Sequence, residues 1–396
     1  MEAQDQKKTS AFKKEIGLET LLFPVFFIGI FVLFAMKMGL ANTLNTMMNT
    51  AYRLLIDTVL YLTAICVIMG AISGLLSEFG FVSLVNRILQ PLMRPIYGLP
   101  GAAALGVVTT FLSDNPAILT LAEDQRFRTY FKTYEFPALT NIGTAFGMGL
   151  IVCTYMYSLS PSMPGEHVGR AVLIGLLGAV IGSIVSTRLM LIFTKKFFGA
   201  EAMKPLHGEG VSEVPVNMRP IRDGGIGSRI MAAMLEGGHS GVKMGVSIVP
   251  GVLVICTLVM MLINGPSESG EYTGAAYEGV RLLPMLAQKI DFLLRPLFGF
   301  TSPEAIGVPV TALGAAGASL SLTAGLVTRG LIGGNDIAVF TAMCMCWSGY
   351  LSTHASMMDS LNCKDLIGKA ILCHTIGGFC AGVAAHWIFV LLRLIF

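Results

Sequence analysis

The pentad Arg94-Pro95-Ile96-Tyr97-Gly98 returns as Arg295-Pro296-Leu297-Phe298-Gly299, 201 residues further along the chain. With no gap, Glu135-Phe136-Pro137-Ala138-Leu139-Thr140 matches Asp336-Ile337-Ala338-Val339-Phe340-Thr341 at the same offset. Chance readily supplies one such pair of segments, but not both pairs in one register. The chain therefore contains two structural repeats, and the orientation of each repeat decides the fold.

The composition indicates that these repeats lie in a lipid bilayer. Of 396 residues, 54% are hydrophobic and only 13% are charged, and the mean hydropathy is +0.71. Such values are typical of an integral membrane protein and argue against a soluble enzyme. The net charge of +3 is too small to indicate a nucleic-acid partner.

Seven apolar stretches are long enough to cross the hydrocarbon core, which takes about 20 helical residues. The first is too long for the core of a signal peptide and follows a polar tail at 1–17, so we expect a retained scaffold helix there. The seven stretches are 18–40, 56–78, 137–159, 168–194, 242–264, 337–358 and 367–395.

Two further apolar stretches, about 101–122 and 303–327, are interrupted in the middle by Ser113-Asp114-Asn115-Pro116 and by residues 314–319. Each half has about 10 residues, which is too short to span the membrane. Both stretches therefore predict re-entrant helical hairpins, whose turns are tolerated where protein or water surrounds them. A single kinked spanning helix is the alternative.

An amphipathic segment precedes each hairpin, at 82–97 and at 280–298. Basic residues alternate with apolar ones in both segments, which is typical of a helix in the membrane interface. An ordinary surface helix between two spans is the alternative.

Lysine and arginine predict the topology, because basic loops stay in the cytoplasm. The tail has four lysines and the loop 195–241 is basic, whereas 265–279 has three glutamates and no Lys or Arg. We expect an all-α fold of about seven transmembrane helices with a cytoplasmic N-terminus. The repeats 41–194 and 242–396 are then inverted relative to each other, with 195–241 as a cytoplasmic linker.

Inverted repeats with broken helices are typical of secondary transporters, which bind solute and ions near the midplane. The first hairpin break offers Ser113, Asp114 and Asn115, and the second hairpin offers Ser319 and Ser321. A charge inside the membrane is costly, so we expect Asp114 to bind an ion or solute. An Asx turn that satisfies the backbone is the alternative.

Other candidate residues lie on the predicted third and sixth spans. Glu135 and Asp336 occupy matching repeat positions, where solute contact competes with simple helix capping. The remaining polar residues either line the site or join helices. They are Thr140, Asn141, Asn335, Ser348, Thr353 and His354. For His354, a proton relay competes with a structural role, and a soft-metal site with Cys344 and Cys346 competes with plain packing.

The chain resembles the nucleoside-recognition, or Gate, domain membrane proteins, which include the spore maturation proteins A and B. The resemblance rests on 92–101, 293–299 and 333–358 and implies two fused halves in a bacterial inner membrane. It extends distantly to the concentrative nucleoside transporters, and so implies opposed hairpins, an elevator motion and a homo-oligomer. Those transporters carry Gly-Gln-Thr-Glu in the first hairpin, where this chain has 111–116.

We therefore expect a cation-coupled transporter of a small polar solute, driven by Na⁺ or H⁺ and needing no cofactor. A nucleoside, an amino acid, a dipeptide and an amphiphile all remain candidate solutes. A metal-ion permease that uses Cys344, Cys346, His354 and Asp336 is one alternative. A non-transporting envelope protein is another. An enzyme is not expected, since no nucleophile–base pair or zinc motif has a usable spacing.

Overall fold

The computed structural model describes residues 15–115, 117–123, 125–204, 221–267 and 269–395. Residues 1–14 of the polar tail, Pro116 of the first hairpin break and 205–220 of the expected linker lie outside this description. All regular elements of the described part are helices, as the sequence predicts. Six helical runs are long and apolar enough to span a bilayer, so the chain is a multi-pass membrane protein. They are Leu18–Met38, Leu40–Glu78, Leu139–Ser162, Val168–Glu201, Ile226–Ile263 and Lys364–Leu394.

Two of these runs begin well before the apolar stretches at 56–78 and 242–264, because their polar ends form helix as well. Asn42 and Asn49, for example, donate to the carbonyls of Tyr272 and Gly274, in the loop that follows the run Ile226–Ile263. One π-helical segment interrupts each run. The N-terminal elements are α1 (Leu18–Met38), α2 (Leu40–Arg53), η1 (Leu54–Val59) and α3 (Leu60–Glu78). The second run comprises α11 (Ile226–Ser247), η5 (Gly251–Cys256) and α12 (Thr257–Ile263).

Helices α3 and α11 pack antiparallel with their backbones in close contact. A methyl group on Gly70 would overlap the carbonyl of Gly237, and one on Gly74 would overlap the carbonyl of Ala233. Small residues allow such close approach between membrane helices, which gain stability mainly from packing. The two helices therefore form a tightly joined pair.

Both predicted hairpins are present, each after an amphipathic helical segment. In each hairpin the first arm contacts the returning arm, since Gly106 faces Ile118 and its repeat equivalent Gly307 faces Leu322. The first set is α4 (Phe81–Leu92), η2 (Met93–Tyr97), α5 (Ala103–Leu112), α6 (Ala117–Glu123) and α7 (Gln125–Thr129). The second set is α13 (Leu282–Lys289), α14 (Asp291–Phe298), η6 (Pro303–Ile306), α15 (Gly307–Ala312) and α16 (Ala316–Thr328).

The predicted third and sixth spans are each broken into two helices. Met148 (φ 56°) and Gly349 (φ 73°) take left-handed conformations at these breaks, and the two residues are equivalent in the repeats. The stretch 337–358 is not among the six long runs, although the third span, which has an equivalent break, is. These elements are α8 (Leu139–Thr144), α9 (Gly149–Ser158), η3 (Ser160–Ser162), α17 (Gly334–Trp347), α18 (Tyr350–Ser360) and η7 (Lys364–Leu366).

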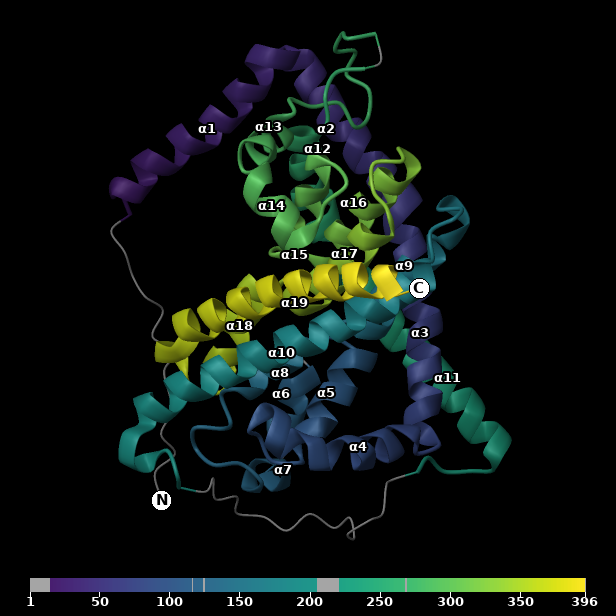
Figure 1. Ribbon diagram of the computed structural model, residues 1–396, viewed down its shortest axis with the longest axis vertical. Helices are drawn as coiled ribbons and strands as arrows, with labels where there is room; N and C mark the ends of the chain where they lie inside the picture. Colours follow the sequence, from purple (N-terminus) through teal and green to yellow (C-terminus); the bar gives the residue numbers. More distant parts are fainter. Residues whose placement is uncertain (1–14, 116, 124, 205–220, 268, 396) are drawn as a thin grey trace.

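The helices α10 (Val168–Phe198) and α19 (Ile367–Ile395) cross the middle of the molecule side by side, and η4 (Gly199–Glu201) follows α10 (Figure 1). They run antiparallel, since Gly178 faces Ala385 while Gly182 faces Gly377. In Figure 1, α4 to α8 lie on one side of this pair and α12 to α16 on the other. The two hairpins thus approach the centre from opposite sides, as inverted repeats require.

Candidate functional site

The tip of the first hairpin inserts into the breaks of both interrupted helices. Asn115 donates from Nδ2 to the Ser348 carbonyl at 2.9 Å, and its Oδ1 accepts a hydrogen bond from Ser348 Oγ at 3.0 Å. A methyl group on Gly147, in the break between α8 and α9, would overlap Asn115 Oδ1. Asn115 and Ser348 are both buried. The hairpin tip and the two helix breaks therefore meet at one point.

The tip of the second hairpin contacts the neighbouring residue of the same break. The N–H of Gly349 donates to the Ala312 carbonyl at 2.9 Å, at the end of α15. A methyl group on Gly349 would lie 3.1 Å from the Gly314 carbonyl. The break between α17 and α18 is thus held by hairpin one at Ser348 and by hairpin two at Gly349. We call this meeting point the hairpin junction.

A cavity of about 290 Å³ lies beside the first tip, between α3 and α11 on one side and α5 and α9 on the other. Thr109, Ser113 and Ile151 form its wall on the hairpin side. Small residues line the opposite wall. They are Cys66, Gly70, Ser73, Gly74, Gly237, Ser240 and Gly241.

Charged residues lie at one end of this cavity. The buried carboxylate of Glu78 accepts hydrogen bonds from Arg222 at 2.5 Å and from Arg229 at 2.6 Å. Arg222 also pairs with Glu236 at 2.6 Å, and Arg222 and Glu236 both line the cavity. These two carboxylates, Glu236 first, raise the pKa of the Arg222 guanidinium above its ordinary value. Arg222 therefore bridges α3 and α11 across the end of the cavity.

Asp114 lies half-buried at the first tip, next to the cavity. Its Oδ1 accepts a hydrogen bond from the Asn115 N–H at 2.7 Å, which is the turn contact that the alternative interpretation requires. No cation pairs with this carboxylate in the described part of the chain. Asp114 thus retains acceptor capacity for an ion or a polar solute, while Ser113 lies on the cavity wall.

Glu135 and Asp336 lie at the starts of the interrupted helices, away from the hairpin junction. Glu135 pairs with Arg94 at 2.6 Å and accepts from the Lys132 N–H at 2.9 Å. Asp336 accepts from the N–H of Thr301 at 3.1 Å and from that of Gly333 at 3.0 Å. Both carboxylates are fully buried, and both tie the start of their helix to the preceding segment. This geometry favours the capping interpretation.

Several other candidates form hydrogen bonds within the helix packing. Asn141 bonds Ser186 and the Ala370 carbonyl, which joins α8 to α10 and α19. Each hydroxyl of the remaining set donates to a carbonyl three or four residues earlier, and Thr353 thereby bonds the Gly349 carbonyl at the hairpin junction. The set comprises Thr140, Ser319, Ser321 and Thr353.

His354 is fully buried, and its ring centroid lies 4.5 Å from that of His374. Its neighbour His374 bonds Ser186 and the Cys346 carbonyl. Asp336 lies at the other end of α17, bound to Thr301. The described residues contain no group of three or more His, Cys, Asp and Glu side chains placed to hold a metal ion.

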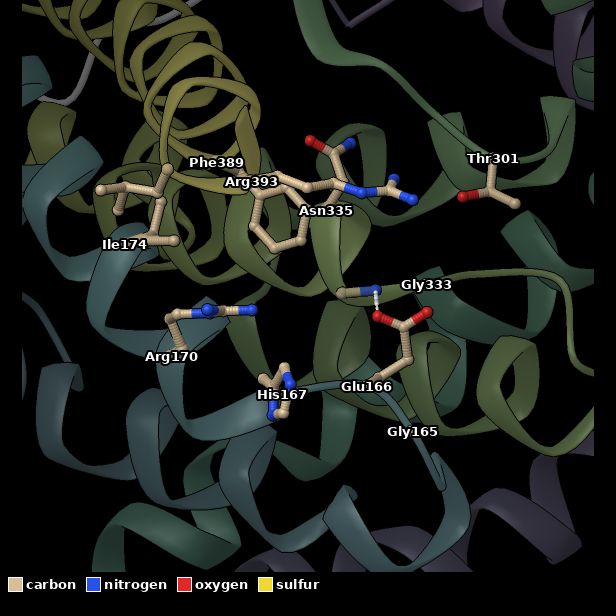
Figure 2. A pocket seen from close by; sticks show the side chains of 12 residues that line it. Gly165, Glu166, His167, Arg170, Ile174, Thr301, Gly333, Asn335, Phe389 and Arg393 are labelled. Carbon is tan, nitrogen blue, oxygen red and sulfur yellow. Dashed lines mark hydrogen bonds between the residues drawn. The ribbon is translucent and has the colours of Figure 1, made fainter. Parts of the chain in front are cut away.

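Asn335 lies in a separate cavity at the start of α17 (Figure 2). Its Nδ2 donates to the carbonyls of Phe298 and Gly299, and its Oδ1 accepts from His386 Nδ1. The structure therefore places Asn335 at a helix start and apart from the hairpin junction.

With this geometry in hand, comparison with known proteins gives a match over about a third of the chain. Residues 59–194, which run from the end of η1 to α10, match the family model of the Gate domain, described as nucleoside recognition. This part of the chain therefore resembles a Gate domain. None of the curated proteins compared with the chain matches it. The matched range contains the first hairpin, the break at Met148 and part of the cavity wall.

Solved structures of the concentrative nucleoside transporter CNTnw resemble most of the chain in fold. The inward-facing substrate-bound state aligns with a TM-score of 0.50 at 12% identity, over 83% of this chain and 74% of that one. A CNTnw variant in an outward-facing state aligns with a TM-score of 0.49 at 14% identity and the same coverage. At these identities the likeness concerns the fold.

The sequence interpretation missed the role of Gly147, Met148 and Gly349 as the two breaks. The signal was available, because Gly147-Met148 and Ser348-Gly349 continue the repeat register at the offset of 201 residues. It also missed the cavity wall on α3 and α11 and the pairing of Arg222 with Glu78. No local pattern marks that pairing, since it joins residues 144 positions apart.

Proposed function

We propose that this chain is a secondary transporter that carries a small polar solute across the membrane with a coupling cation. The hairpin junction carries the proposal, because the tips of two inverted hairpins contact one helix break there. Broken helices of inverted repeats present backbone groups to solute and ions near the bilayer midplane. Asp114 supplies the cation ligand, Na⁺ or a proton, and Ser113 supplies a hydrogen bond to the solute, while Asn115 holds the hairpin tip at Ser348.

The proposed motion exposes this site alternately to the two sides of the membrane. The glycine contacts hold α3 and α11 together as a scaffold, while the hairpins and broken helices move against it as an elevator. The cavity between Ser113 and Arg222 then serves as the route from the site to one face. The basic loops favour the cytoplasm as that face, and we place the chain in the inner membrane of a bacterium.

Nucleosides are the first solutes to test, because the family model describes nucleoside recognition. Purified protein is reconstituted in proteoliposomes, and uptake of labelled uridine and adenosine is measured under an imposed Na⁺ or H⁺ gradient. Amino acids and dipeptides follow in the same assay. We expect gradient-dependent uptake in the native protein and none in Asp114→Asn, since the amide keeps the turn but loses the charge.

The matched control is Asp57→Asn, which removes a carboxylate that is about half exposed and weakly paired with Arg53. It should transport like the native chain. Full uptake by Asp114→Asn removes Asp114 from the site. Failure of every solute under both gradients contradicts the transporter proposal and favours a non-transporting envelope protein. Stabilisation by divalent metals alone favours a metal-ion permease.

A further inference from the structure

A second cavity, of about 280 Å³, is lined by charged side chains that the proposed transport cycle does not use. It lies where α10 and α17 begin and α19 ends (Figure 2). Arg170 is in the first turn of α10 and Arg393 in the last turn of α19. Both helices belong to membrane-spanning runs and they are antiparallel. This cavity is therefore at the boundary between hydrocarbon and water.

More basic than acidic side chains line this cavity. Arg170, Arg393 and His167 line the cavity together with one carboxylate, Glu166. Glu166 accepts a hydrogen bond from the Gly334 N–H at 2.8 Å, so the carboxylate already caps the start of α17. Neither arginine forms an ion pair in the described part of the chain, although a carboxylate lies in the same cavity.

The neutral polar side chains that line the cavity already donate all their polar hydrogens to other protein groups. Thr301 donates its hydroxyl to Asp336, and Asn335 donates both amide hydrogens to the carbonyls of Phe298 and Gly299. The free donors on the lining side chains are thus the two guanidiniums and the imidazole. Figure 2 shows both guanidiniums extending from the helices into the cavity region. Such a set selects for an anion.

We propose that this cavity binds a phosphate ester. A guanidinium presents paired N–H groups that match the spacing of phosphate oxygens, and the tetrahedral group accepts from several directions at once. Arg170 and Arg393 bind the phosphate oxygens from α10 and α19, and His167 contributes a third donor. Ile174, Phe389 and Leu392 form an apolar wall beside them, which accommodates the carbon portion of the ester.

Two sources can supply this chemistry. A phospholipid places its headgroup phosphate at the membrane boundary, where the cavity lies, and a soluble phosphate ester can enter from water. The test uses purified native protein in detergent at constant ionic strength. Apparent melting temperature is followed during titration with glycerol 3-phosphate and, separately, with short-chain phosphatidylglycerol. Sodium chloride is the blank.

We expect saturable stabilisation, weakened about tenfold or more in apparent affinity by Arg170→Gln and by Arg393→Gln, as for a lost charged hydrogen bond. Arg87→Gln is the matched control, since Arg87 is an exposed arginine on the interfacial helix α4. Glu166→Gln should bind several-fold more tightly, because glutamine can still accept from Gly334 while the repelling charge is gone.

The two titrations distinguish a phospholipid from a soluble phosphate ester. Stabilisation by the lipid alone identifies a headgroup site, and stabilisation by both compounds identifies a site for phosphate esters in general. The proposal is overturned if neither compound stabilises the protein. It is equally overturned if Arg87→Gln weakens binding as much as the cavity variants do, because the effect is then general surface charge. None of these readouts depends on transport, so the result stands apart from the proposed function.

Discussion

Asn115→Ala tests the contact on which the hairpin junction depends. The substitution removes two hydrogen bonds with Ser348, and each contributes about 1 kcal/mol net. Asn115 is only 1% exposed and Ser348 only 6%, so water does not readily replace the amide. The Ser348 carbonyl then stays unpaired, so losing this bond costs about 1–3 kcal/mol instead of about 1 kcal/mol, and losing the bond from Ser348 Oγ adds about 1 kcal/mol. We expect a total loss of about 2–4 kcal/mol of unfolding free energy.

The assay is equilibrium unfolding of the purified protein in mixed micelles with increasing SDS. Asn49→Ala is the matched control, since the exposed Asn49 amide donates one hydrogen bond to the Gly274 carbonyl. Its loss should cost less than about 1 kcal/mol. A double-mutant cycle with Ser348→Ala should give a coupling of about 1 kcal/mol for the side-chain contact. Equal losses for Asn115→Ala and Asn49→Ala would refute the junction as described.

Three further predictions address the break, the cavity and the outer loop. Gly349→Ala should destabilise the protein more than Gly330→Ala, as measured by equilibrium unfolding. Both glycines are left-handed, which costs alanine about 1–2 kcal/mol. A methyl group on Gly330 meets nothing within 4 Å, whereas one on Gly349 would lie 3.1 Å from the Gly314 carbonyl of hairpin two. Arg222→Ala should speed the labelling of Cys66 by a membrane-impermeant maleimide, measured by peptide mass spectrometry, because the bridge at the cavity end is lost. Glu278→Gln should flatten the fall in melting temperature on acidification below about pH 4.5, the ordinary value for glutamate.

The acid prediction follows from the surroundings of Glu278. Burial alone would raise its pKa, but hydrogen bonds from the Thr273 hydroxyl and from the backbone of Thr273 and Gly274 outweigh burial and hold the pKa below its ordinary value. A depressed folded-state pKa stabilises the protein above the unfolded value, and that contribution is lost as the pH falls through the folded value. Parallel acid profiles for the native and variant proteins contradict this account.

The labelling prediction has its own control in Lys204→Ala. This variant breaks the exposed ion pair between Lys204 and Glu201, away from the cavity lining, and should leave Cys66 labelling unchanged. Glu236→Gln removes only one end of the Arg222 bridge and keeps the pair between Glu78 and Arg229. An intermediate labelling rate is expected for it. Native-like rates in both bridge variants show that Arg222 does not limit access.

Much of the fold could be predicted from local sequence patterns. Membrane spans follow from hydropathy, because each backbone group in lipid must be satisfied within its own helix. The hairpins follow from the interruptions at 113–116 and 314–319, and the repeats follow from the constant offset. Helix ends were less well predicted. The polar residues at 41–55 and 226–241 continue the helices, because loops and neighbouring helices supply their partners.

The candidate site was predictable only in part. Asn115 and Ser348 were both singled out, and the structure brings them together. In the sequence, Glu135 and Asp336 are indistinguishable from acids that bind a ligand. In the structure, nearby donors already bind the carboxylate of each. A sequence cannot distinguish these outcomes, because the free energy of a buried carboxylate depends on which groups surround it.

By itself, the sequence determined that the chain lies in a membrane, repeats once and inverts between the repeats. These properties depend on composition and spacing, which act over one helix length. Only the tertiary structure decided that Asn115 enters the break at Ser348, 233 residues away, and that the charges of Arg170 and Arg393 share one cavity. The reason is physical: a hydrogen bond or ion pair requires a spacing of about 3 Å, and packing of all the helices together sets that spacing.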